Sequence, residues 1–200
     1  MLEKGKKMDK PVDSAAVSLK SRSGTAITGM LVFLASEVFL FGSLFFTYYY
    51  LRMNNPVWPP AGVHLDTTLA VINTAILLSS SIVVWLAARF MRKGNISGMA
   101  AALLSTSVLG FAFLGITIWE WTHETFQPWT SAYGSIFYTM TGFHALHVLG
   151  GVLLMLALFI RARRGRYSAG NFTAVEVGSL YWHYVDVVWI LVFTTLFLIR

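Results

Sequence analysis

Five long apolar stretches set the strongest limit on how this chain can fold. They cover residues 27–51, 67–88, 98–119, 132–160 and 177–199. Each reaches the ~20 residues that a helix needs to cross the hydrocarbon core of a bilayer. Because lipid excludes unpaired backbone groups, each stretch must form a helix or a strand of a closed barrel. The stretches are too long for barrel strands and lack their alternating pattern. The sequence therefore predicts an all-α polytopic membrane protein, a bundle of five transmembrane helices.

The composition agrees with this class and excludes several others. Of the 200 residues, 56% are hydrophobic and only 12% are charged, which is typical of membrane proteins. The chain has no cysteine, so disulfides, iron–sulfur clusters and thiolate metal sites are excluded. None of its five prolines lies inside a stretch, and no internal repeat is visible. A transporter with inverted halves and broken helices is therefore disfavoured.

The basic residues predict how the helices are oriented. Thirteen of the 15 Lys and Arg residues lie before the first stretch, between the second and third, or between the fourth and fifth. Because positive charge accumulates on the cytoplasmic side, we expect a cytoplasmic N-terminus and a C-terminus outside. We expect residues 1–23 to form a polar cytoplasmic tail and residues 24–200 the transmembrane domain. The net charge of +6 is thus an orientation signal and gives no indication of nucleic-acid binding.

Ionisable residues inside the apolar stretches need an explanation, because each costs several kcal/mol in hydrocarbon. They are Glu37, His144, His147, His183 and Asp186. His183 and Asp186 are three residues apart, so they share one helical face. Depths estimated from the helical rise would allow Glu37, His147, His183 and Asp186 to cluster in the inner half of the bundle. Small residues around the histidine pair, followed by Gly150 and Gly151, predict close helix packing there.

Three interpretations of the histidines remain open. Pairing His183 with His144 or His147 would supply the two axial ligands of one haem. A di-metal or copper site would need these histidines to converge with Glu37 or Asp186. In the third interpretation each histidine hydrogen-bonds a carboxylate or a backbone carbonyl across a helix interface. We favour the third interpretation over both metal sites.

Glu37 is the sharpest candidate for a functional side chain. Its apolar neighbours predict a desolvated carboxyl group, and desolvation favours the neutral acid. We expect it to hydrogen-bond a histidine or Asn73 of the second helix. Such a group would act as a proton relay or as a hydrogen bond that joins two helices. For an isolated glutamate the second role is favoured.

Several motifs, taken together in their order and spacing, resemble subunit III of cytochrome c oxidase along residues 27–199. The last stretch carries the most specific one, Tyr-Trp-His-Tyr-Val-Asp-Val-Val-Trp at residues 181–189. The others are Ser36-Glu37-Val38, Trp58-Pro59-Pro60 with Gly62, Asn73-Thr74 with Leu77-Leu78, Tyr133-Gly134-Ser135, Thr141-Gly142-Phe143-His144 with Leu146-His147-Val148, and Glu176. The chain is similar to the short, five-helix bacterial form of this family of haem-copper oxidase subunits.

The resemblance implies an accessory subunit of a proton-pumping terminal oxidase in the aerobic respiratory chain. It implies that this chain is not catalytic and holds no cofactor, with haem and copper in partner subunits I and II. It implies a multi-pass protein of the bacterial inner cell membrane that carries bound phospholipid and supports proton uptake. The family's buried polar set falls on Glu37, Asn73, His144, His147, Glu176, His183 and Asp186.

A basic cluster at the cytoplasmic end of the fourth stretch predicts a lipid site. Arg161, Arg163 and Arg164 stand where the phosphates of anionic headgroups lie. Arg161 also falls where the family has a lipid-contacting arginine.

Two alternative functions remain. Relatives of the same fold serve quinol oxidases and nitric oxide reductase complexes, although the motifs look more like the cytochrome c branch. A membrane cytochrome b that uses the intramembrane histidines is a more distant alternative.

Overall fold

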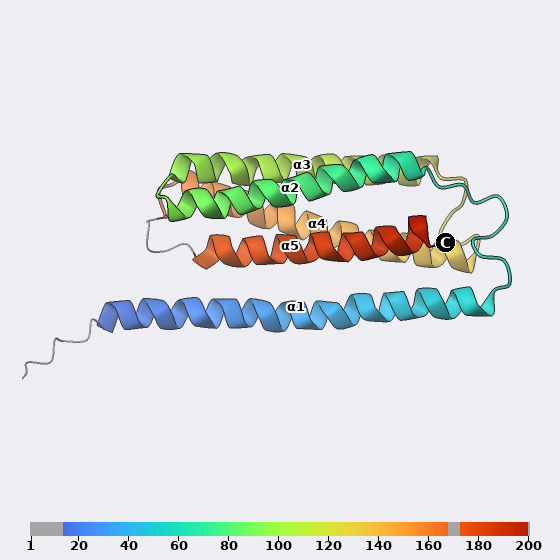
Figure 1. Cartoon of the computed structure of the whole chain (residues 1–200), viewed down its shortest axis with the longest axis horizontal. Coiled ribbons are helices and arrows are strands. Elements are labelled where there is room, and N and C mark those ends of the chain that lie inside the picture. The colour runs from blue at the N-terminus through green and yellow to red at the C-terminus, as the bar shows by residue number, and fades with distance from the viewer. Residues whose placement is uncertain (1–13, 168–172, 200) are drawn as a thin grey trace, which may run out of the picture.

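The computed structural model describes residues 14–167 and 173–199, with the side chains of the first helix described from residue 24 on. Its elements are α1 (Ser14–Asn54), α2 (Thr67–Arg92), α3 (Ile96–His123), α4 (Ala132–Arg163) and α5 (Thr173–Phe193), which continues as a short π-helix, η1 (Thr194–Leu198). All five long helices are long and apolar enough to cross a membrane. They lie side by side as a bundle (Figure 1). The predicted all-α class and the five transmembrane helices are confirmed, and the orientation of the termini stays a prediction.

The helices extend beyond the predicted apolar stretches. α2 continues from residue 88 to Arg92, and α3 continues from residue 119 to His123. α1 begins at Ser14, so the described part of the predicted tail is helical. Residues 1–13 lie outside the described residues.

Three helices begin at a polar capping residue. Asp66, Asn95 and Ser131 each accept a hydrogen bond from the backbone N–H three residues later, at 3.0, 2.8 and 3.0 Å. These bonds satisfy N–H groups that the first helical turn leaves unpaired. Gly94, at φ 72°, then lets the chain turn directly from α2 into α3. The short connection holds α2 and α3 as an antiparallel pair.

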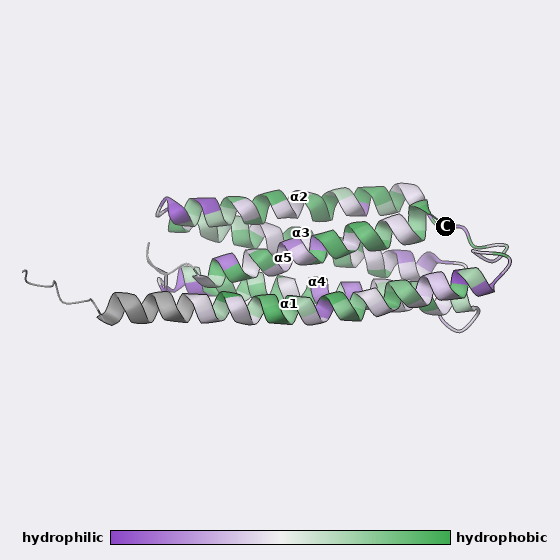
Figure 2. Ribbon diagram, turned by 60° about the horizontal axis from the view of Figure 1, so that its bottom comes forward, coloured by the Kyte–Doolittle hydropathy of each residue, from purple (hydrophilic) through white to green (hydrophobic). Residues whose placement is uncertain are grey.

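α5 is the most enclosed helix of the bundle. In its most apolar window 61% of the residues are buried, against 11% for α1. α5 packs against α1, α2 and α4, while α3 closes the arc between α2 and α4. Hydrophobic residues cover the lengths of the helices, and hydrophilic residues gather mainly towards the two ends (Figure 2). The fold therefore surrounds α5, which carries the signature of residues 181–189.

Trp182 of α5 fits into a slot made by two glycines. A Cβ atom on Gly110 of α3 would lie 2.8 Å from the Trp182 ring, and one on Gly151 of α4 would lie 2.7 Å from it. The indole N–H of Trp182 donates to the Ser80 hydroxyl of α2 at 2.9 Å. The side chain is fully buried. Trp182 of α5 thus contacts α2, α3 and α4.

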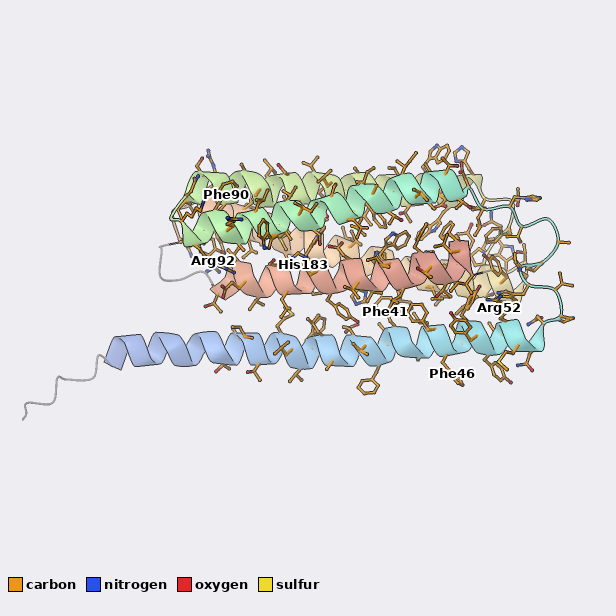
Figure 3. The ribbon with its side chains drawn as sticks, in the orientation of Figure 1. Phe41, Phe46, Arg52, Phe90, Arg92 and His183 are labelled. Atoms are coloured by element: carbon orange, nitrogen blue, oxygen red, sulfur yellow. The ribbon has the colours of Figure 1, made fainter. Side chains whose placement is uncertain are left out.

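α1 is attached to the bundle mainly along one face. Phe41 points towards the bundle and is buried, while Phe46 points away from it (Figure 3). Near the end of α1, the Tyr48 hydroxyl donates to the carbonyl of Thr195 in η1 at 3.2 Å. Arg52 donates to the carbonyl of Ile199. On the opposite face of α1, Phe39 and Phe46 are exposed.

Candidate functional site

Glu37 and His147 form a pair between α1 and α4. Glu37 Oε2 lies 2.9 Å from His147 Nε2, and the two side chains are only 15% and 14% exposed. The edge of the Phe41 ring covers the imidazole, with 5.1 Å between the ring centroids. The Tyr181 hydroxyl of α5 donates to the backbone carbonyl of His147 at 2.9 Å. Three helices therefore meet at this pair.

The surroundings of His147 define where its protons lie. Its Nδ1 is 2.7 Å from the carbonyl oxygen of Phe143. A carbonyl oxygen only accepts, so Nδ1 carries a proton. Nε2 then either accepts the proton of a neutral Glu37 or, in the imidazolium, donates to the carboxylate. Both forms have zero net charge. The pair can therefore stay in the membrane while its shared proton moves between oxygen and nitrogen.

His183 and Asp186 are joined through Ser81 of α2. The Ser81 hydroxyl donates to Asp186 Oδ2, and its oxygen lies 2.8 Å from His183 Nδ1. Because the hydroxyl proton is used on the carboxyl group, the oxygen accepts from Nδ1–H. Figure 3 shows His183 on the side of α5 that faces α2. The shared face predicted from the spacing thus becomes a three-residue hydrogen-bonded chain between two helices.

The other predicted polar residues occupy separate places. Asn73 is buried and donates to the carbonyl of Phe113 at 3.3 Å and to the Thr117 hydroxyl at 3.1 Å, which joins α2 to α3. Glu176 lies in the first turn of α5, 3.8 Å from Arg92, in a largely exposed ion pair. Such a pair contributes about 0–1 kcal/mol. Arg92 and Glu176 thus mark the end of the bundle at which α2 stops and α5 begins.

His144 lies in the core and contacts aromatic rings. Its imidazole is fully buried, with its ring centroid 4.8 Å from that of Trp189 and 5.7 Å from that of Phe113. Neither ring nitrogen has a hydrogen-bond partner among the described residues. The prediction of a hydrogen bond to a carboxylate or carbonyl is therefore wrong for His144, because apolar rings of α3 and α5 surround it.

The polar residues do not converge on one centre. Within residues 14–167 and 173–199, no three His, Cys, Asp or Glu side chains are arranged to hold a metal ion. Both ring nitrogens of His147 and of His183 already have partners in the protein. The suggested cluster is therefore replaced by two separate hydrogen-bonded groups, Glu37–His147 and His183–Ser81–Asp186. The spacing in the sequence shows which residues share a helical face, but it does not show which neighbouring helix that face contacts.

The predicted lipid site lies at the end of α4. Arg161, Arg163 and Arg164 are all exposed. The Arg161 guanidinium lies over the ring of Tyr167, 5.8 Å from the ring centroid to Cζ. This stacking holds one cation at the helix end, while the other two are free to turn towards a headgroup. The arrangement therefore leaves all three arginines accessible to a phosphate.

Sequence reasoning missed an acidic group at the opposite end of the bundle. Glu120 is 6% exposed, and its Oε1 has no hydrogen-bond partner among the described residues. Glu124 and Asp66 lie within electrostatic range of it. Burial raises the pKa of the Glu124 carboxyl to about 7, and the nearby charge of Asp66 adds to the rise. The sequence feature that could have revealed this group is the run of polar residues by which α3 continues beyond its apolar stretch.

Glu124 makes the stability of the bundle depend on pH. Its folded-state pKa exceeds its ordinary value of 4.5, so the protein loses stability as pH rises from about 4.5 to about 7. We expect a lower melting temperature in detergent at pH 8 than at pH 5. Glu124→Gln should reduce this difference by a few °C, and Asp66→Asn should reduce it less, because burial is the larger cause. Identical pH profiles for all three proteins would contradict this assignment.

Comparison with known proteins gives a consistent result over most of the chain. A family model described as "Cytochrome c oxidase subunit III" matches residues 17–199. A cytochrome c oxidase subunit 3 from Thermostichus vulcanus is 40% identical over 174 residues, which are 86% of this chain and 87% of the relative. The protein of the same name from Bacillus subtilis is 39% identical over 195 residues, covering 94% and 92%. The protein of that name from Anopheles gambiae is 35% identical over 176 residues, covering 84% of this chain and 67% of the relative.

Proposed function

Because the chain belongs to the cytochrome c oxidase subunit III family, we propose that it packs beside subunits I and II of a terminal oxidase and holds no redox centre itself. It is an accessory subunit III of a haem-copper oxidase, and it is a multi-pass membrane protein. The membrane is the inner membrane of a bacterial cell, and the haem and copper lie in the partner subunits. The electron donor is cytochrome c, as in the names of the relatives.

The hydrogen-bond partners of the intramembrane histidines support the proposal that this chain holds no redox centre. A chain that ligates haem or copper presents ring nitrogens that converge on one point. Here His147 Nε2 and His183 Nδ1 bond to other helices, and the second nitrogen of each ring bonds within its own helix. The nitrogens of His144 have no partner in the part of the chain that the structure describes, and they face aromatic rings of α3 and α5. The Glu37–His147 pair instead offers a proton that moves without changing the net charge. This chemistry supports a subunit that stabilises the catalytic chain and assists proton uptake beside it.

Co-purification tests the function directly. A tagged form of this chain, isolated from its own membranes in mild detergent, should retain a large membrane partner that carries haem. The same chain expressed without partners should show no Soret band. A Soret band on the isolated chain would support the membrane cytochrome b. Absence of any haem-bearing partner in the tagged complex would contradict membership of an oxidase.

The basic end of α4 is proposed to hold an anionic phospholipid by its phosphate. Arg161→Ala should lower the amount of phospholipid retained by the purified complex, as measured by native mass spectrometry. Arg92→Ala is the matched control, because it removes a cation at the same end of the bundle, on α2. Equal retention in both variants and the wild type would disprove the site.

A further inference from the structure

A long apolar pocket opens between α3 and α4 on the outer surface of the bundle, where Phe111, Ile118 and Leu146 of its lining are exposed. Its volume is about 720 Å³, within the ~300–1,000 Å³ range of ligand pockets. Residues between 111 and 121 of α3 and between 138 and 149 of α4 line it. Gly115 and Gly142 form part of its wall, where larger side chains would fill the space.

The lining offers hydrocarbon rather than polar contacts. The Tyr138 hydroxyl lies 3.2 and 3.1 Å from the carbonyl oxygens of Trp121 and Phe126, to which it donates. The Thr139 hydroxyl donates to the carbonyl of Ser135 at 2.7 Å. Both hydroxyl protons of the lining are thus used within the protein. A ligand that fits must itself be apolar along the length of the pocket.

The length of the pocket matches one leaflet of a bilayer. Ten residues of α3 separate Phe111 from Trp121, which is about 15 Å of helix. That is half of the roughly 30 Å hydrocarbon core. Just beyond the Phe111 end of the pocket α3 and α4 pack closely, since a Cβ atom on Gly110 would lie 2.5 Å from Val152. A partner helix that crosses the membrane would need a groove along both leaflets.

One end of the pocket lies near an end of the bundle, the level at which a membrane-spanning helix meets the headgroups. Trp121 and Tyr138 stand there, near the C-terminal end of α3 and the N-terminal end of α4. Trp and Tyr are enriched at the level of the headgroups. We propose that the pocket holds an acyl chain of a glycerophospholipid from this leaflet. The site is separate from the Arg161 cluster, which lies at the opposite end of α4.

A photoreactive lipid tests the proposal in the intact assembly. Cells that express the tagged chain are given a diazirine-bearing fatty acid, which they incorporate into phospholipids. After illumination of the membranes, the cross-linked peptides of the purified complex are mapped by mass spectrometry. We expect residues 111–121 and 138–149 to carry severalfold more label than the exposed face of α1 around Phe39 and Phe46.

Filling variants separate this site from ordinary lipid contact. Gly115→Phe and Gly142→Phe should each lower the label in both segments severalfold. Protein atoms come no closer than 3.9 Å to a Cβ at either position, so the new side chain has room. Gly42→Phe is the control, because Gly42 of α1 also has no atom within 4 Å of a built Cβ but lies outside the pocket. Gly115→Leu is the smaller filler if the Phe variants do not accumulate.

Three outcomes would overturn the proposal. The label of the two segments could equal that of α1, it could persist in the filled variants, or Gly42→Phe could lower it as much as the filling variants do. A severalfold loss of label in the filled variants, with none in Gly42→Phe, would support it.

Discussion

Gly151→Leu should prevent the chain from accumulating in a folded form, and Gly151→Ala should destabilise it by about 1–3 kcal/mol through overpacking. A Cβ at this position would lie 2.7 Å from Cε3 of Trp182. The Trp182 ring has nowhere to move, because its N–H is bound to Ser80 and its other edge lies against Gly110. The free energy of unfolding of a whole domain is only ~5–15 kcal/mol, so such a loss is large.

The preceding residue supplies the control for this prediction. A Cβ on Gly150 would lie 3.4 Å from the Tyr181 hydroxyl, at the edge of an ordinary contact. Gly150→Ala should therefore be neutral, or stabilising by up to about 1 kcal/mol through helix propensity. Thermal unfolding in detergent and resistance to protease measure both variants. Equal stability of Gly151→Ala and Gly150→Ala would show that Trp182 does not set the distance between α4 and α5.

The second large effect concerns the Glu37–His147 pair. We expect Glu37→Ala to leave the haem content and the initial rate of oxygen reduction of the complex largely intact, because Glu37 ligates no redox centre. The subunit should instead dissociate more readily, or activity should decay faster during turnover. The physical reason is that Nε2 of a half-buried His147 loses its partner, which costs about 1–3 kcal/mol. Ser36→Ala is the control, because the Ser36 hydroxyl bonds within α1 at 2.6 Å.

A comparison with Glu37→Gln separates a structural role from a proton-carrying one. The amide keeps the shape of the side chain and a hydrogen bond to His147, but it does not titrate. If the pair only joins α1 to α4, Gln should be milder than Ala. If it passes protons, both variants should be equally harmful. Turnover number, inactivation half-life and subunit retention decide between them.

Asp186→Ala should behave like Glu37→Ala, because it breaks the chain through Ser81. Its initial rate of oxygen reduction should stay near that of the wild type, while subunit retention falls. Loss of haem from the complex in either variant would contradict the accessory role itself.

The sequence predicts the fold well because a membrane leaves few choices. Five apolar stretches of sufficient length, separated by capping residues and prolines, admit one class of architecture. The spacing of His183 and Asp186 also predicts a shared face, and the structure bridges both through Ser81. The bridging residue could not be predicted, because it lies on another helix. Helical periodicity does not reveal which faces of two helices meet.

Two features lay beyond the reach of such patterns. Close packing at Gly151 was predicted, but the Trp182 slot was not, because Gly110 lies on another helix about 40 residues away and only tertiary packing brings the two glycines together. The burial of Glu120 was hidden because hydropathy ends the third stretch at residue 119, while the hydrogen bonds of α3 continue to His123. Hydropathy therefore does not show whether a polar residue that extends an apolar helix is buried.

The enclosed position of α5 has a consequence for how the chain is made. α1 to α4 precede α5 in the sequence, so a ribosome delivers them to the membrane before the helix around which they pack. During that interval Ser80 and Ser81 lack the side chains that they bind in the folded protein, and the space between Gly110 and Gly151 lacks its indole. The packing around α5 can therefore be completed only after this last helix has entered the membrane.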